Sequence, residues 1–95
     1  MIVLETDEFR DWLVNLPDAR ARAKVLARVR RLSLGNPGDV RPVGGGISEM
    51  RIDYGPGYRV YLVRRGADVT LLLVGGDKST QRRDVSRALR LARAI

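Results

Sequence analysis

Two alternating segments joined by a tight turn place the strongest constraint on the fold of this chain. In ISEMRID, Met50 and Ile52 alternate with charged residues, and RVYLVRR repeats this period of two after the turn YGPGY at residues 54–58. A period of two is typical of strands with one face in the core and the other outward. Glycine and proline in the turn complete the pattern of a hairpin. The sequence therefore predicts an antiparallel β-hairpin.

Three segments with helical spacing surround this hairpin. The first has apolar residues at i, i+3, i+4 and i+7, namely Phe9, Trp12, Leu13 and Leu16. Thr6 or Asp7 can cap it, and Asp18 can cap a second helix from Ala19 to about Leu34, which Gly35 ends. The third helix closes the chain with a stripe formed by Val85, Ala88, Leu89 and Ala92. These spacings predict amphipathic helices that each bury one side.

The remaining segments complete a single α+β domain over residues 1–95. MIVLE reads as a short strand, residues 35–46 as a loop, and VTLLLV, apolar on both faces, as the central strand. The predicted order is β-α-α-β-β-β-α, with a small, mainly antiparallel, four-stranded sheet. The N-terminal helical hairpin is expected on one face, where it would bury Phe9, Trp12 and Leu26. A C-terminal helix follows the sheet.

The other face of the sheet is predicted to be charged and exposed. It would carry the second set of strand residues, which are Glu49, Arg51, Arg59 and Tyr61. Arg51 and Arg59 come from neighbouring strands and are expected to share a phosphate, while Tyr61 could stack on a base. Lys78 follows Gly75-Gly76-Asp77 at the start of a helix, a plausible anion cradle. The simpler interpretation is an ordinary hairpin with surface ion pairs.

Composition narrows the possible partners and chemistry. The net charge is +7, and 16 of the 18 basic residues are arginine. This favours a polyanionic partner over a merely solvated basic surface. Cysteine and histidine are absent, so no metal site or cofactor is predicted, and acid–base chemistry must use other groups. No apolar run approaches the length of a membrane span, and a cytoplasmic protein with no membrane partner is expected.

Two long blocks carry a resemblance to a known family. SEMRIDYGPGYRVYLVRRG and the later LLLVGGDKSTQRRDVSRA resemble the RelE/ParE superfamily of type II toxin–antitoxin toxins, in particular its HigB-like branch of phage-linked addiction-module killer proteins. The resemblance covers nearly the whole chain. It implies a RelE-like fold, with a small antiparallel sheet, a helical hairpin on one face and a closing helix. This agrees with the element order predicted above.

The resemblance implies a metal-independent endoribonuclease that cleaves mRNA on the ribosome and inhibits translation. Family chemistry would proceed by attack of a ribose 2′-OH on the adjacent phosphate. By position, Arg51 and Arg59 would clamp the phosphate, Lys78 would stabilise the leaving group or the phosphorane, and Glu49 would be a base. Further RNA contacts are expected from Tyr54, Tyr58, Tyr61, Arg64, Arg82 and Arg83.

The residue that would act as the general base is not identified at this point, because no aromatic residue or histidine follows Tyr61 in the C-terminal segment. Glu49 would need a raised pKa, and Tyr61 a pKa lowered by the neighbouring arginines. The ribosome could instead supply much of the catalysis by bending the mRNA into in-line geometry.

The resemblance also implies partners and leaves alternatives. A cognate antitoxin, of helix-turn-helix, HigA-like type, would neutralise the toxin, and the two together would bind operator DNA. Exposed apolar residues near Leu13 or Val14 could help to dock it. A ParE-like gyrase inhibitor without nuclease activity is the main alternative, and a non-catalytic nucleic-acid-binding module is another.

Overall fold

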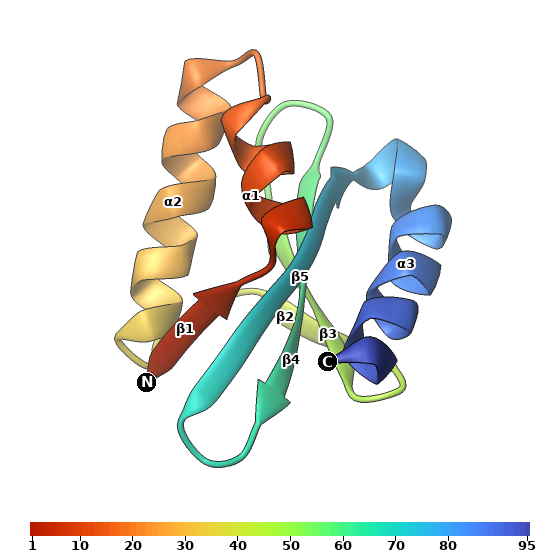
Figure 1. The fold of residues 1–95 in the computed structure, drawn as a ribbon. Coiled ribbons are helices and arrows are strands. Elements are labelled where there is room, and N and C mark those ends of the chain that lie inside the picture. Colours follow the sequence, from red (N-terminus) through yellow and green to blue (C-terminus); the bar gives the residue numbers. More distant parts are fainter.

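The computed structural model describes all residues from 1 to 95 and has the predicted α+β fold with a RelE-like arrangement. Figure 1 shows the order of its elements. They are β1 (Ile2–Glu5), α1 (Asp7–Val14), α2 (Ala19–Ser33), β2 (Val40–Gly44), β3 (Ile47–Ile52), β4 (Tyr58–Arg65), β5 (Val69–Asp77), a 3₁₀ turn (Lys78–Thr80) and α3 (Gln81–Ala94).

The sheet has five strands in the order β1-β5-β4-β3-β2. β1 pairs with β5 in parallel, and all other neighbours are antiparallel, so the sheet is mixed. The additional strand, β2, lies within the stretch expected to be a loop, and it pairs Val40 with Met50 of β3. The prediction that VTLLLV forms the central strand is wrong, because β4 occupies the centre of the sheet and β5 lies between β1 and β4.

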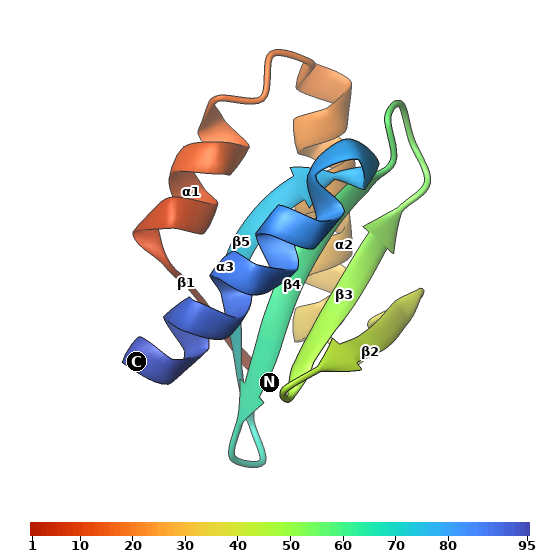
Figure 2. The same cartoon turned by 90° about the vertical axis from the view of Figure 1, so that its right-hand side faces the viewer.

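Helices cover both faces of the sheet. Figure 2 shows α3 crossing one face while α2 lies behind the other. The core on the side of α1 and α2 includes Phe9, Leu13, Val25, Leu32, Met50, Val60 and Leu62. The core under α3 includes Ile47, Tyr61, Val63, Leu73, Val74 and Ala88. The stripe predicted for the third helix is therefore buried against the face that was expected to be open.

The helical hairpin buries most of its predicted stripe. Phe9 and Leu13 are buried, and Trp12 packs against the same core. The expectation for Leu26 is wrong, because its side chain is 54% exposed while the preceding Val25 takes the inward position. Val14 is also exposed.

The predicted helix caps are confirmed. The Thr6 side chain accepts a hydrogen bond from the Phe9 amide at 3.0 Å, and Asp18 accepts one from the Arg20 amide at 2.9 Å. A cap of this kind contributes about 1 kcal/mol. None of the three helices has the length and apolar character needed to cross a membrane.

Two glycines let helices approach the end of β5 closely. A Cβ atom at Gly75 would lie 2.1 Å from a ring carbon of Trp12, in α1. A Cβ at Gly76 would lie 1.9 Å from a carboxylate oxygen of Asp84, in α3. Side chains would not fit at either position, so the glycines fix how α1 and α3 flank this strand.

Candidate functional site

The three cations singled out in the sequence line one groove at the β3–β4 turn, which we call the basic groove. Arg51 and Arg59 are direct cross-strand partners in β3 and β4, and Lys78 begins the turn that follows β5. Gly57, in the turn, lies next to both Lys78 and Arg59. A Cβ atom at this position would be 3.6 Å from Cβ of Lys78 and 3.7 Å from Nη1 of Arg59. The groove has a volume of ≈ 390 Å³ and is also lined by Asp39, Ile52, Asp53, Gly55, Pro56 and Gly57.

A buried carboxylate lies between the two arginines of this groove. Glu49 is 3% exposed. Its Oε1 lies 3.7 Å from Nε of Arg51 and 3.7 Å from Nε of Arg59. Its Oε2 accepts hydrogen bonds from the Tyr61 hydroxyl at 2.9 Å and from Gln81 Nε2 at 2.7 Å. Glu49 therefore offsets the charge of two arginines whose positions it helps to fix.

The arginines differ in their access to solvent. Arg51 is half-buried, while Arg59 is 5% exposed and its Nε has no hydrogen-bond partner. Lys78 is exposed. A phosphate in the groove would therefore meet Lys78 and Arg51 directly, and the Arg59 guanidinium from the wall of the groove.

The expectation that this face of the sheet is open is wrong, because α3 covers much of it. Tyr61 is fully buried in the core under α3 and cannot stack on a base. Its pKa is raised, not lowered, chiefly because burial disfavours the charged phenolate and also because the hydroxyl donates to Glu49. The apolar stripe of α3 packs against the face of the sheet that carries Tyr61.

The other two tyrosines also have structural contacts. Tyr58 is buried and packs edge-on against Trp12, with ring centroids 6.3 Å apart, so the expected RNA contact is wrong for this residue. The half-buried Tyr54 donates a hydrogen bond to Asp18 at 3.0 Å, and the Lys24 ammonium lies 5.2 Å from its ring centroid. That hydrogen bond is the main reason why the pKa of Tyr54 is raised and the pKa of Asp18 is lowered. Tyr54 thus ties the β3–β4 turn to the start of α2.

The remaining arginines expected to contact RNA lie in two places. Arg82 and Arg83 are exposed on the first turn of α3, soon after Lys78, and line a depression with Ser79, Thr80 and Ser86. They extend the basic surface beyond the groove. Arg64 is near the opposite end of β4, where it donates to the Ala67 carbonyl at 3.3 Å. Five residues of strand place it roughly 17 Å from Arg59, so Arg64 is not part of this surface.

The anion cradle expected after β5 is occupied by the chain itself. Asp77 accepts a hydrogen bond from the Ser79 amide at 2.8 Å, and Thr80 donates to Asp84 at 2.5 Å. The Ser79 amide is the backbone group that would have bound an anion, and it is already paired with Asp77. The pKa of Asp77 is lowered, first by its hydrogen bond with the Ser79 hydroxyl. Lys78 remains as the basic group that this turn offers to a ligand.

Sequence reasoning missed two residues that support the groove. Gln81 contacts Glu49 only because α3 docks on the sheet. Arg28, in α2, donates to the backbone carbonyl of Arg51 and, at 3.0 Å, to that of Pro37, and burial lowers its pKa. Nothing in the spacing of either residue indicates these contacts, since both depend on segments that are distant in sequence.

Comparison with known proteins places the chain among phage-related sequences. The family described as phage-derived, Gp49-like proteins matches residues 11–94. An uncharacterized protein of Haemophilus influenzae is 49% identical over 87 residues, which cover 92% of this chain and 88% of the relative.

Proposed function

The chain belongs to the family of phage-derived Gp49-like proteins, and from this membership we propose that it is the toxin of a type II toxin–antitoxin module, acting as a ribosome-dependent endoribonuclease. The resemblance to the HigB-like branch of the RelE/ParE superfamily supports the assignment to a toxin. The basic groove supports the nuclease activity. The groove presents Lys78 and Arg51 to solvent, with Arg59 in its wall, and this arrangement suits an extended polyanion such as mRNA better than a small substrate.

One observation carries the proposal: Arg51, Arg59 and Lys78 line a single groove. In the proposed reaction the ribose 2′-oxygen attacks the adjacent phosphorus, and the bond from phosphorus to the 5′-oxygen breaks. The 2′-hydroxyl proton passes to an acceptor on the ribosome or in solvent, and the leaving oxygen gains a proton. Negative charge builds up on the phosphorane. Fixed guanidinium and ammonium groups stabilise such charge without having to reorganise.

The proposed roles follow from exposure. Arg51 and Lys78 contact the scissile phosphate, and Arg59 adds positive charge from the groove wall. Glu49 acts as a positioning residue rather than as the base, because both of its oxygens face donors or cations of the chain. Tyr61 is buried with a raised pKa, which removes it as a base. We therefore favour an in-line geometry imposed by the ribosome as the source of most of the remaining catalysis.

The proposal extends to the partners and the location of the protein. A toxin that cleaves mRNA acts in the cytoplasm on translating ribosomes and needs a cognate antitoxin. We propose a helix-turn-helix, HigA-like antitoxin, with operator DNA bound only by the toxin–antitoxin complex. The net charge of +7 suits an acidic region on that partner.

The test compares the wild-type chain with the double variant Arg51→Gln/Lys78→Gln. Both side chains are at least partly exposed, so the variant should fold. After induced expression, mRNA 5′ ends are mapped on translating ribosomes. The variant is expected to cleave mRNA at least about 100-fold more slowly, because removing a single donor to a developing oxyanion already costs that much. Growth arrest should be relieved in parallel.

The matched control is Arg64→Gln/Arg65→Gln, which removes the same charge at the far end of β4 and should keep full activity. Growth arrest by the wild type with intact mRNA would contradict the nuclease proposal. Arrest accompanied by stalled gyrase and DNA damage would indicate the ParE-like alternative instead.

A further inference from the structure

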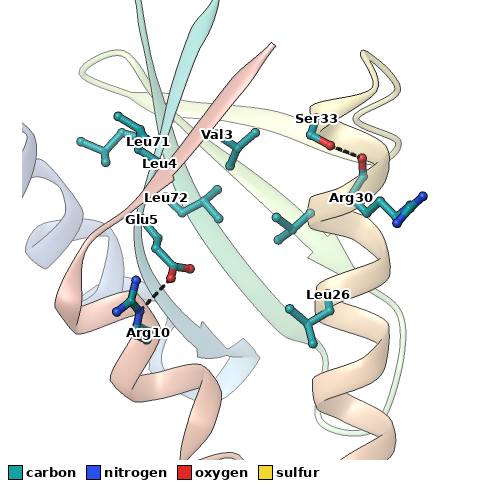
Figure 3. A pocket seen from close by; sticks show the side chains of 10 residues that line it. Val3, Leu4, Glu5, Arg10, Leu26, Arg30, Ser33, Leu71 and Leu72 are labelled. Carbon is teal, nitrogen blue, oxygen red and sulfur yellow. Dashed lines mark hydrogen bonds and ion pairs between the residues drawn. The ribbon is translucent and has the colours of Figure 1, made fainter.

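A second groove, which we call the β1–α2 groove, runs between the first strand and the second helix. Figure 3 shows it from close by, with Val3 and Leu72 pointing toward the helix and Leu26 facing them. Its volume is ≈ 840 Å³, compared with ≈ 390 Å³ for the basic groove. Six of its ten lining residues are apolar, namely Val3, Leu4, Leu26, Val29, Leu71 and Leu72.

The strand that borders this groove is an open edge of the sheet. β1 pairs only with β5. The Ile2 amide donates to the Asp68 carbonyl and the Thr6 amide to the Leu72 carbonyl. Because strand groups alternate in direction, the amides of Val3 and Glu5 face away from β5, toward the open edge. They can bond to another strand without disturbing the existing sheet.

The opposite edge of the sheet, formed by β2, is protected against pairing with other chains, whereas the β1 edge is not. β2 carries Pro42, which has no N–H to donate, and its register shifts between Pro42 and Gly44. The exposed Arg41 adds a charge to that edge. These features prevent pairing with other chains. β1 has no proline, the charge of its Glu5 is paired with Arg10 at 2.8 Å, and its Ile2 and Leu4 are 56% and 52% exposed.

The charge around the groove indicates which kind of segment could add to this edge. α2 contains six basic residues and no acidic one. Arg22 and Arg30 lie one helical turn on either side of Leu26, whose exposed side chain lines the groove. A second copy of this chain, with net charge +7 and its own basic helix, would be repelled. An acidic segment would be attracted.

We propose that the β1–α2 groove binds an extended, acidic segment of a partner protein, which adds to β1 as a strand and places alternate apolar side chains between β1 and α2. This mode of recognition obtains affinity from backbone hydrogen bonds and selectivity from the side-chain groove. The inference goes beyond the proposed function, because the groove shares no residue with the basic groove. A partner could therefore be held here while the cations remain accessible.

The probe is a displayed library of random 12-residue peptides, selected against the folded full chain. We expect selected sequences to alternate apolar and acidic residues. Synthetic versions should bind Leu26→Asp at least roughly tenfold more weakly, the equivalent of one good apolar contact. Val14→Asp is the matched control, since it alters an exposed apolar residue of α1 outside the groove, and it should bind as the wild type does.

Two further measurements test the charge and the backbone. Arg30→Glu should weaken binding of the acidic peptides by roughly fivefold, whereas Arg31→Glu, its exposed neighbour outside the groove, should have a smaller effect. Amide hydrogen exchange should slow at Val3 and Glu5 when peptide is bound, because these N–H groups gain acceptors.

Several results would overturn the proposal. They are the absence of enrichment, selection of basic peptides, affinity that is indifferent to Leu26→Asp, and unchanged exchange at Val3 and Glu5. Dimerisation of the free chain that protects the same two amides would assign the edge to a second copy instead. None of these readouts depends on RNA cleavage, so a failure here leaves the proposed function intact, and the reverse holds too.

Discussion

Glu49 helps to organise the basic groove although its own side chain is buried. A buried carboxylate is unfavourable unless charges and donors surround it. Glu49 has two arginines on one oxygen and the hydroxyl of Tyr61 and amide of Gln81 on the other. These partners come from three elements, β3, β4 and α3, so loss of any one alters the surroundings of the arginines. The site is thus specified by its buried partners as much as by its exposed cations.

The Tyr61 hydroxyl gives this arrangement a measurable pH dependence. The pKa of Tyr61 is raised above its ordinary value of 10.0 in the folded chain. Above about pH 10 the unfolded chain releases this proton while the folded chain keeps it, so the free energy of unfolding falls as pH rises. Tyr61→Phe should remove this contribution and make the decline less steep. At neutral pH the variant should lose about 1–2 kcal/mol, because Glu49 loses a buried donor.

Urea denaturation at pH 8 and at about pH 10.5 measures both effects. Tyrosinate absorbance supplies the control. While the chain remains folded, wild type and Tyr61→Phe should show the same rise in absorbance, since Tyr61 does not ionise. A larger rise in the wild type would show that Tyr61 is accessible to base and would contradict its burial.

At the scale of elements, close contacts at the end of β5 determine how α1 and α3 pack against the sheet. Gly75 meets Trp12 of α1 on one face, and Gly76 meets Asp84 of α3 on the other. The same strand end leads into Lys78. The position of the groove's exposed lysine therefore depends on two close contacts between a strand and its flanking helices.

Gly75→Ala tests this dependence. The added methyl group would overlap the Trp12 ring, and overpacking of this kind costs about 1–3 kcal/mol. Gly66→Ala is the control, because its Cβ would meet no atom within 4 Å and only its positive φ of 73° is strained, at about 1 kcal/mol. The midpoint of urea unfolding should fall further for Gly75→Ala. Equal shifts would show that α1 can move away without cost.

The sequence predicted the helices and strands better than it predicted which of their faces are buried. Alternation in β3 and β4 and helical spacing in α1, α2 and α3 identified the fold class, and the caps at Thr6 and Asp18 were identified by residue type. β2 was missed because Pro42 and the neighbouring glycines are typical of loops, although edge strands tolerate them. The convergence of Arg51, Arg59 and Lys78 follows from strand order, which the sequence could indicate.

The burial of Tyr61 could have been inferred. The predicted stripe on the last helix needed an apolar partner, and the face that carries Tyr61 and Val63 was the free one. By contrast, the contacts of Gln81 and Arg28 depend on the exact docking of distant segments, so no local pattern could reveal them.

At the scale of the whole molecule, positive charge is spread widely while the cations of the basic groove are concentrated at one end of the sheet. A net charge of +7 attracts any polyanion over long range, but only groups that contact phosphates release counterions. Salt dependence therefore separates cations that bind RNA from those that merely surround it.

We predict that the affinity for a single-stranded RNA falls linearly with salt on logarithmic axes. Lys78→Gln should reduce the slope by roughly 0.7, the value for one phosphate contact on a single strand. Arg64→Gln removes a charge near the far end of β4 and should leave the slope unchanged. Fluorescence anisotropy over a range of salt concentrations provides the measurement. Equal slope changes for the two variants would mean that RNA binds without preference for the basic groove.

The parallel pairing of β1 with β5 has a consequence for the order of events during translation. Ile2 is aligned with Val69, so the first strand has no neighbour in the sheet until β5 has left the ribosome. Gln81 and the buried side of α3 arrive later still. Glu49, Arg51 and Arg59 lie in the earlier β3–β4 hairpin, but the surroundings of Glu49 are complete only after α3 has been made. The proposed site is therefore incomplete while only β3 and β4 have emerged, because the amide of Gln81 that binds Glu49 is not yet present.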